Sequence, residues 1–104
     1  MEGVKTAFKT ETSFKLELFF GFFIFCAIIL LPLTFSSKLI LFTTAVIIPV
    51  AELLNSAIEN LVDLVTKDIH PLAKNAKDLG AAAVLFSVLL HLVCWIVIIF
   101  SELL

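Results

Sequence analysis

The chain has 104 residues, of which 62% are hydrophobic and 15% are charged, and its formal net charge is −2. Soluble domains are roughly half apolar, so this composition excludes an ordinary soluble domain and indicates a single all-α unit embedded in a membrane. The balance of charge gives no reason to expect a nucleic-acid partner. Two cysteines, Cys26 and Cys94, lie in apolar runs and are expected to be core or lipid-facing residues, not a disulfide or metal pair.

The first 35 residues predict two helical segments. Residues 1–15 place apolar side chains at helical spacing among three lysines, which favours a short amphipathic helix on the membrane surface. Residues 16–35 form the first predicted span, with Glu17 at the entry and Pro32 near the far end. The uncharged run is long enough to cross a hydrocarbon core of about 30 Å. It is too long for a signal peptide and is expected to be retained.

A second span is predicted over residues 39–65, after a tight turn at residues 36–38. Pro49 lies inside this span and is expected to bend the helix, because proline removes a backbone hydrogen bond. Residues 66–78 follow as a polar loop, in which Pro71 is expected to act as a helix breaker.

The third predicted span covers residues 79–101, and its only ionisable side chain is His91. The span begins with small residues, which allow helices to approach closely in a membrane. A lone histidine in an apolar helix is more often a hydrogen-bonding group between helices than a proton relay, and His91 is expected to have the former role.

The lysines predict the orientation of the spans. Three precede the first span, three lie between the second and third, and only Lys38 lies between the first and second. The positive-inside rule places the N-terminus and the 66–78 loop in the cytoplasm. The C-terminus is then expected on the opposite side of a bacterial cytoplasmic (inner) membrane.

A polar stripe interrupts the second span. Glu52, Asn55, Glu59 and Asp63 follow one another at steps of three, four and four residues, so on a helix they fall within roughly 80° of one another. An acidic side chain at the centre of a membrane costs about 3 kcal/mol even on lenient scales. Three explanations are open: pairing with lysines or with other subunits, a proton or ion path, and metal-assisted phosphoryl transfer.

Phosphoryl transfer would give each polar group a task. Mg²⁺ binds carboxylate oxygens together with water and phosphate, and Glu11 and Glu59 at the interface are candidate ligands. Lys77 is a candidate partner for phosphate, and the deeper Glu52 is a candidate general base. A base inside the bilayer requires a substrate hydroxyl that arrives from the lipid phase, which indicates a lipid alcohol. The spacing alone does not choose between this chemistry and an ion path.

Three segments together resemble the prokaryotic diacylglycerol kinase family. ELLNSAIENLVD, at residues 52–63, matches the pattern Glu-x-x-Asn-Ser/Thr-Ala-x-Glu-x-x-x-Asp, and AKD follows at residues 76–78. Upstream, ETSFKLE matches Glu-x-x-Phe-x-x-Glu at residues 11–17. The resemblance covers most of the chain, from about residue 3 to the end of the third span.

The resemblance implies an all-α membrane protein with three transmembrane helices, a short N-terminal amphipathic surface helix and a homotrimeric helical bundle. It also implies a kinase that transfers the γ-phosphate of MgATP to the hydroxyl of diacylglycerol, giving phosphatidic acid. Undecaprenol kinase is the alternative within this class. A small helical channel or transporter subunit is the alternative outside it.

The same resemblance assigns roles to individual residues. Glu52 matches the catalytic base, Asn55 matches a supporting polar group, and Glu11 and Glu59 match the Mg²⁺ ligands. Positions matching nucleotide contacts are Glu11, Glu59, Asp63, Asp68, His70, Lys77 and Asp78. Positions matching lipid contacts are Phe14, Glu17, Glu52, Ala81 and Trp95.

Several of these residues also have plainer explanations. His70 would serve equally as a solvated loop residue, Trp95 as a packing residue and Asp78 as the N-cap of the third span. The chain departs from better-known members of the family in two respects. Those members have a longer N-terminal helix with further nucleotide contacts, and they carry serine where this chain has Ala81. Both departures concern details of the ATP and lipid contacts.

Overall fold

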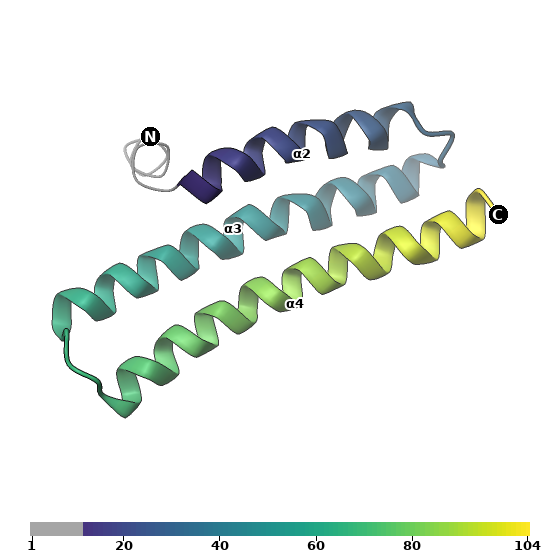
Figure 1. Cartoon of the computed structure of the whole chain (residues 1–104). Coiled ribbons are helices and arrows are strands. Elements are labelled where there is room, and N and C mark those ends of the chain that lie inside the picture. Colours follow the sequence, from purple (N-terminus) through teal and green to yellow (C-terminus); the bar gives the residue numbers. More distant parts are fainter. Residues whose placement is uncertain (1–11) are drawn as a thin grey trace.

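Three antiparallel helices make up the described part of the protein, residues 12–104 of a computed structural model. They are α2 (Thr12–Leu30), α3 (Phe35–Val65) and α4 (Pro71–Glu102), and no strand occurs in that range. Figure 1 shows α3 between the other two, with α4 along its length and α2 beside its first half. Of the predicted surface helix, residues 1–11 lie outside the described residues, and residues 12–15 belong to the first turn of α2.

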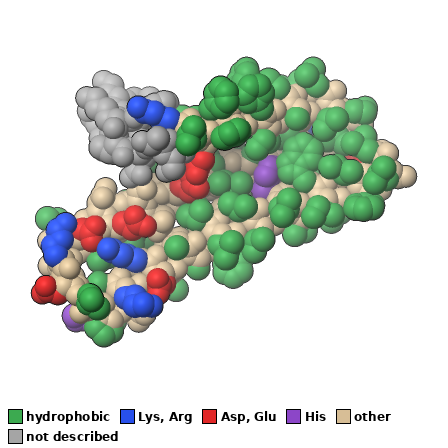
Figure 2. Space-filling view, viewed as in Figure 1, with side chains coloured by type: hydrophobic (Ala, Val, Ile, Leu, Met, Phe, Trp, Pro, Cys, Tyr) green, Lys and Arg blue, Asp and Glu red, His purple; other side chains and the backbone are tan. Residues whose placement is uncertain are grey.

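Both long helices have the dimensions of membrane spans. The 31 residues of α3 and the 32 of α4 extend about 46 and 48 Å at 1.5 Å per residue, whereas the hydrocarbon core measures about 30 Å. Among the described residues, these two helices are long and apolar enough to cross a membrane. Figure 2 shows lysine, aspartate and glutamate side chains gathered where α3 joins α4, and hydrophobic side chains dominating elsewhere.

The connection between α2 and α3 corrects the predicted boundaries. The first helix ends at Leu30, not at residue 35, and the predicted turn at residues 36–38 lies inside α3. Pro32 explains the early end, because a residue that precedes proline disfavours the helical conformation. Thr34 then caps α3, since its Oγ1 accepts a hydrogen bond from the backbone N–H of Ser37 at 3.2 Å.

The connection between α3 and α4 is also shorter than predicted. Residues 71–78 form the first two turns of α4, so the loop comprises residues 66–70. Pro71 starts this helix instead of breaking one, because proline at the first helical position loses no hydrogen bond. The N-cap is His70, whose Nδ1 accepts from Leu72 N–H at 3.1 Å, so the alternative role of Asp78 as N-cap is wrong. In α3, Pro49 lies inside the helix, which continues through it without a break.

A buried hydrogen-bonded chain joins α3 to α4 within the apolar region. Trp95 Nε1 donates to His91 Nε2 at 2.9 Å, and His91 Nδ1 lies 2.7 Å from Thr44 Oγ1. Because Nε2 accepts, the ring proton of neutral His91 is on Nδ1 and is donated to Thr44. The Thr44 hydroxyl then donates to Ile40 O at 3.0 Å. The predicted role of His91 as a satisfied interhelical group is confirmed.

A second set of polar contacts joins the end of α4 to the start of α3, at the end of the bundle away from the 66–70 loop. The carboxylate of Glu102, in the last turn of α4, accepts from the backbone N–H of Thr34 at 2.8 Å and from the Ser37 hydroxyl. An acid at a helix N-terminus is favourable, because unpaired N–H groups and the positive end of the helix dipole lie there. A small apolar core of Ile28, Leu41 and Ile98 lies inside this end. Cys26 and Cys94 are free thiols and are half-buried.

Candidate active site

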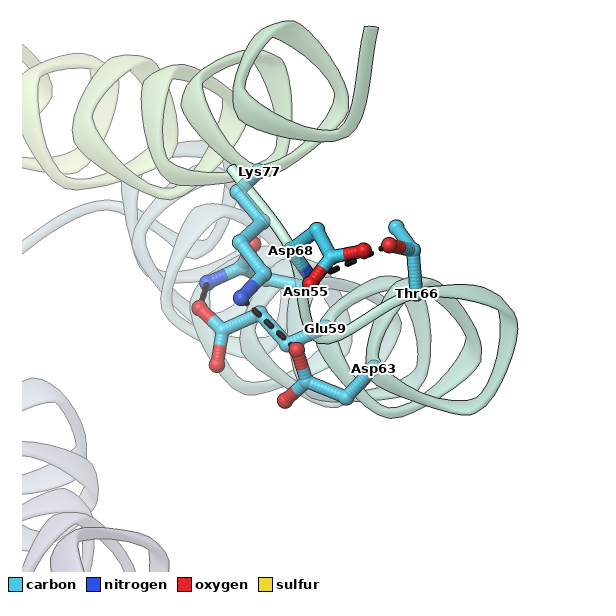
Figure 3. Close-up of polar contacts among 6 residues, drawn as sticks. All are labelled: Asn55, Glu59, Asp63, Thr66, Asp68 and Lys77. Atoms are coloured by element: carbon cyan, nitrogen blue, oxygen red, sulfur yellow. Dashed lines mark hydrogen bonds and ion pairs between the residues drawn. The ribbon is translucent and has the colours of Figure 1, made fainter. Parts of the chain in front are cut away.

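The polar stripe predicted for residues 52–63 lies on a continuous helix in α3. Asn55 Nδ2 donates to Glu59 Oε1 at 3.2 Å, which links neighbouring turns of the stripe. Lys77 reaches across from α4, and its Nζ donates to Asp63 Oδ1 at 2.8 Å. Figure 3 shows Asn55, Glu59 and Asp63 on the side of α3 that faces Lys77. The hairpin of α3 and α4 thus places a lysine against a row of acids.

Lys77 is held as a cation by its neighbours. The side chains of Lys77 and Asp63 are each 42% exposed, so this ion pair contributes little to stability. The hydrogen bond that Lys77 donates to Asp63 raises the pKa of Lys77, burial acts in the opposite direction, and the charges of Asp63 and Glu59 add to the rise. A positively charged ammonium group therefore stands at the edge of the acidic stripe.

A polar cleft of about 300 Å³ opens where α3 and α4 join. Five of the seven predicted nucleotide residues line it: Asp63, Asp68, His70, Lys77 and Asp78. Glu59 lies one helical turn from Asp63, and Glu11 lies outside the described residues. The hairpin brings these groups together because α4 begins directly after a five-residue loop.

The groups around this cleft are already engaged with one another. The backbone N–H of Asp68 donates to Thr66 Oγ1 at 3.0 Å, which shapes the loop. Because His70 Nδ1 serves as the helix cap, its other ring nitrogen is the one available to a ligand. Asp78 accepts from Lys74 at 2.9 Å.

Two lysines outside the set predicted from the sequence also line the cleft. They are Lys67 and Lys74, which the sequence offered only as orientation signals. The spacing of Lys74 and Asp78, four residues apart on a helix, was the available sign that they would meet. Three lysines therefore line this cleft of about 300 Å³.

The lipid-side residues are not gathered into one pocket. A cleft of about 290 Å³ between α2 and α3 is lined almost wholly by apolar side chains, together with Glu17 and His91. Glu17 Oε2 is buried there without a hydrogen-bond partner among the described residues. Ala81 is exposed on α4, and Trp95 donates to His91. The side chain of Phe14 lies outside those that the structure describes.

Glu52 lies further along the stripe, away from the polar cleft. It is half-buried, and seven residues, or about 10 Å along the helix, separate it from Glu59. The stripe thus runs from a charged end at Asp63 to a carboxylate in the apolar part of α3. This gradient suits a reaction between a water-soluble and a membrane-soluble substrate.

The donor chemistry around Glu59 fits a magnesium ion. Residues 12–104 contain no group of three or more acidic, histidine or cysteine side chains that would enclose a metal. Mg²⁺ does not need such a cage, because it retains several waters and uses one or two carboxylates with substrate phosphates. Glu59 is exposed and lies next to the cleft that Lys77 lines, which meets that requirement.

Residues 1–99 match the sequence pattern described as "Prokaryotic diacylglycerol kinase". The chain belongs to the prokaryotic diacylglycerol kinase family. The match includes all of α2 and α3 and nearly all of α4, so both clefts and the polar stripe lie inside the family region.

Three bacterial relatives named diacylglycerol kinase illustrate the family. The Haemophilus influenzae protein is 39% identical over 101 residues, covering 91% of this chain and 80% of that protein. The Pseudomonas aeruginosa protein is 33% identical over 95 residues, covering 91% and 77%. The Escherichia coli protein is 29% identical over 104 residues, covering 97% and 83%. The similarity therefore extends over most of each chain.

Proposed function

We propose that this protein is an ATP-dependent lipid kinase that transfers the γ-phosphate of ATP to the hydroxyl of diacylglycerol, giving phosphatidic acid. One observation carries the proposal: a single face of α3 connects the lysine-lined cleft to a half-buried carboxylate. Asp63 lines the cleft, Glu59 is one turn away, and Glu52 is two turns beyond that. Family membership and the names of the relatives support the same reaction.

The nucleotide phosphates would occupy the polar cleft. Lys77 would neutralise phosphate charge, with Lys67 and Lys74 close by. Asp68, His70 and Asp78 would contact the rest of the nucleotide from the loop and the first turns of α4. Glu59, with Glu11 as the family resemblance implies, would hold Mg²⁺. When bound, this ion stabilises the charge that develops on the transferred phosphoryl group.

Glu52 would act at the lipid end as the general base. It would accept the proton of the lipid hydroxyl. The hydroxyl oxygen would form a bond to the γ-phosphorus, and the bond between the γ-phosphorus and the oxygen bridging it to the β-phosphate would break. Catalysis of phosphoryl transfer is mostly positioning and charge stabilisation, which suits residues fixed on rigid helices. Phe14, Glu17, Ala81 and Trp95 would line the lipid side.

The membrane arrangement follows from the same proposal. The 19 residues of α2 extend about 28 Å, close to the thickness of the hydrocarbon core, and α2 would make a third transmembrane crossing. The N-terminus and the loop between α3 and α4 would face the cytoplasm, and the C-terminus the opposite side. The protein would be a homotrimer, and the many exposed phenylalanine, leucine and isoleucine side chains would contact lipid or neighbouring subunits.

The decisive experiment uses the purified protein with MgATP and a panel of lipid alcohols. Diacylglycerol and undecaprenol are supplied separately in mixed micelles, and phosphate transfer to each is measured. The proposal expects phosphatidic acid as the main product. Transfer to undecaprenol alone would show that undecaprenol, not diacylglycerol, is the acceptor. No transfer to any lipid alcohol, with ion flux into liposomes in the absence of ATP, would favour a channel.

A further inference from the structure

Near the site, α4 packs tightly against the Asn55 side chain of α3 at Gly80. This glycine is buried in α4, and a Cβ added to it would collide with the Oδ1 atom of Asn55. The same Cβ would lie 3.2 Å from Asn55 Cγ and 3.6 Å from Ile58 Cδ1. The contact with Ile58 is ordinary, so the space above Gly80 is occupied specifically by the Asn55 side chain.

The position of Asn55 fixes the direction of its amide. Its Nδ2 donates to Glu59 Oε1 at 3.2 Å, whereas its Oδ1 is buried without a hydrogen-bond partner among the described residues. Reversing the amide would turn Oδ1 towards the carboxylate of Glu59 and replace an attraction with a repulsion. In this arrangement the carbonyl oxygen occupies the space that Gly80 leaves open.

We propose that Gly80 is a positioning residue of the active site, because the absence of a side chain there lets Asn55 hold its amide on Glu59. An unpaired buried acceptor is unfavourable, and glycine is a weaker helix former than alanine. Both features are explained if the amide of Asn55 has to point at Glu59. The role of Glu59 rests on the proposed function, whereas the contact between Gly80 and Asn55 does not.

The consequence concerns how the site binds Mg²⁺. Groups that orient a metal ligand typically change metal affinity or activity by about 10–100-fold when they are removed. Displacing Asn55 from Glu59 should therefore raise the Mg²⁺ concentration needed for half-maximal rate. The KM for the lipid should change much less, because neither Gly80 nor Asn55 is among the residues proposed to contact the lipid. A general packing defect would not affect the Mg²⁺ requirement and the lipid KM so differently.

The test is a double-mutant cycle of Gly80→Ala and Asn55→Ala. Gly80→Ala should raise the half-maximal Mg²⁺ concentration about tenfold, and Asn55→Ala should raise the same quantity. The double variant should be no worse than Asn55→Ala alone, since the added methyl then has no amide to displace. The proposal would be overturned if Gly80→Ala kept the wild-type Mg²⁺ dependence. It would also be overturned if the increase in half-maximal Mg²⁺ concentration in the double variant were the product of the increases in the two single variants.

Thermal unfolding without nucleotide or metal gives an independent reading of the same cycle. Gly80→Ala should lower the Tm when Asn55 is present and should not lower it in the Asn55→Ala background. Gly21→Ala is the matched control in α2, where an added Cβ meets nothing within 4 Å, and its Tm should stay the same or rise.

Two further results of the experiment are also decisive. If Gly80→Ala alone does not fold, the double variant should, and its failure would reject Asn55 as the obstructed group. If the wild-type protein transfers no phosphate, the proposed function fails, while the Tm cycle still tests the contact between Gly80 and Asn55.

Discussion

The acidic side chains of α3 differ in their surroundings, and these differences separate their expected roles. Asp63 accepts from Lys77 and Glu59 accepts from Asn55, both near the polar cleft. Glu52 is half-buried further along the helix. A carboxylate in less polar surroundings is better suited to accept a proton, whereas exposed carboxylates are better suited to a hydrated metal.

Replacing Glu52 by glutamine tests its role as the base. Glu52→Gln keeps the shape of the side chain but cannot accept the hydroxyl proton, so the rate of phosphate transfer should fall about 10²–10⁴-fold. Activity is measured with MgATP and diacylglycerol, and the oligomeric state and Tm are measured beside it. A fully active variant would remove Glu52 from the mechanism.

Glutamine at position 59 tests the metal role separately. Glu59→Gln retains an oxygen that can accept from Asn55 but loses the negative charge. We expect a higher Mg²⁺ requirement and weaker use of MgATP, measured by titrating Mg²⁺ at fixed ATP and lipid. An unchanged Mg²⁺ dependence would refute the metal role.

Between elements, polar contacts determine how α3 lies on α4. In a membrane the hydrophobic effect does not drive helices together, so packing and hydrogen bonds between helices decide their register. The chain from Trp95 through His91 to Thr44 joins the middle of the two helices. Glu102 on Thr34 and Ser37 joins one end, and Lys77 on Asp63 the other.

The middle contact is tested by Thr44→Val, which leaves the ring N–H of buried His91 without an acceptor. The free energy of unfolding should fall by about 0.6–2 kcal/mol, because interhelical hydrogen bonds in membranes contribute about 0.6 kcal/mol on average in double-mutant cycles and about 1–2 kcal/mol in model peptides. Thr43→Val is the matched control, because Thr43 is exposed and its replacement should change stability by less than about 0.5 kcal/mol. Equal effects of the two substitutions in detergent unfolding would contradict the importance of the His91 contact.

At the scale of the whole molecule, the hairpin of α3 and α4 separates a charged end from an apolar body (Figures 1 and 2). This division matches a reaction that joins a nucleotide from water with an alcohol from lipid. The loop of residues 66–70 and the first turns of α4 carry the charges. They have to lie on the side where ATP is available.

Labelling of introduced cysteines tests this orientation. A cysteine in place of Lys67 should react with a membrane-impermeant thiol reagent only from the cytoplasmic side, and one in place of Leu104 only from the opposite side. The reagent is applied to intact cells and to inverted membrane vesicles, with unmodified protein as the control for Cys26 and Cys94. Labelling of both positions from the same side would contradict a single crossing by α4.

The sequence by itself determined the helical class, the apolar segments and the spacing of the polar stripe. These features are local, because periodicity and composition depend only on neighbouring residues. It did not determine the helix boundaries at Leu30 and Pro71, where the effect of each proline depended on which residue capped the next helix. It identified the residues at positions 63, 68, 70, 77 and 78 through resemblance, but not their common cleft.

Only the tertiary structure decided which side chains meet. The contacts of Lys77 with Asp63, His91 with Thr44 and Gly80 with Asn55 join residues 14, 47 and 25 positions apart in the chain. No local pattern specifies such pairs, because they depend on the register of α4 against α3. That register follows from a five-residue loop and the polar contacts along the hairpin.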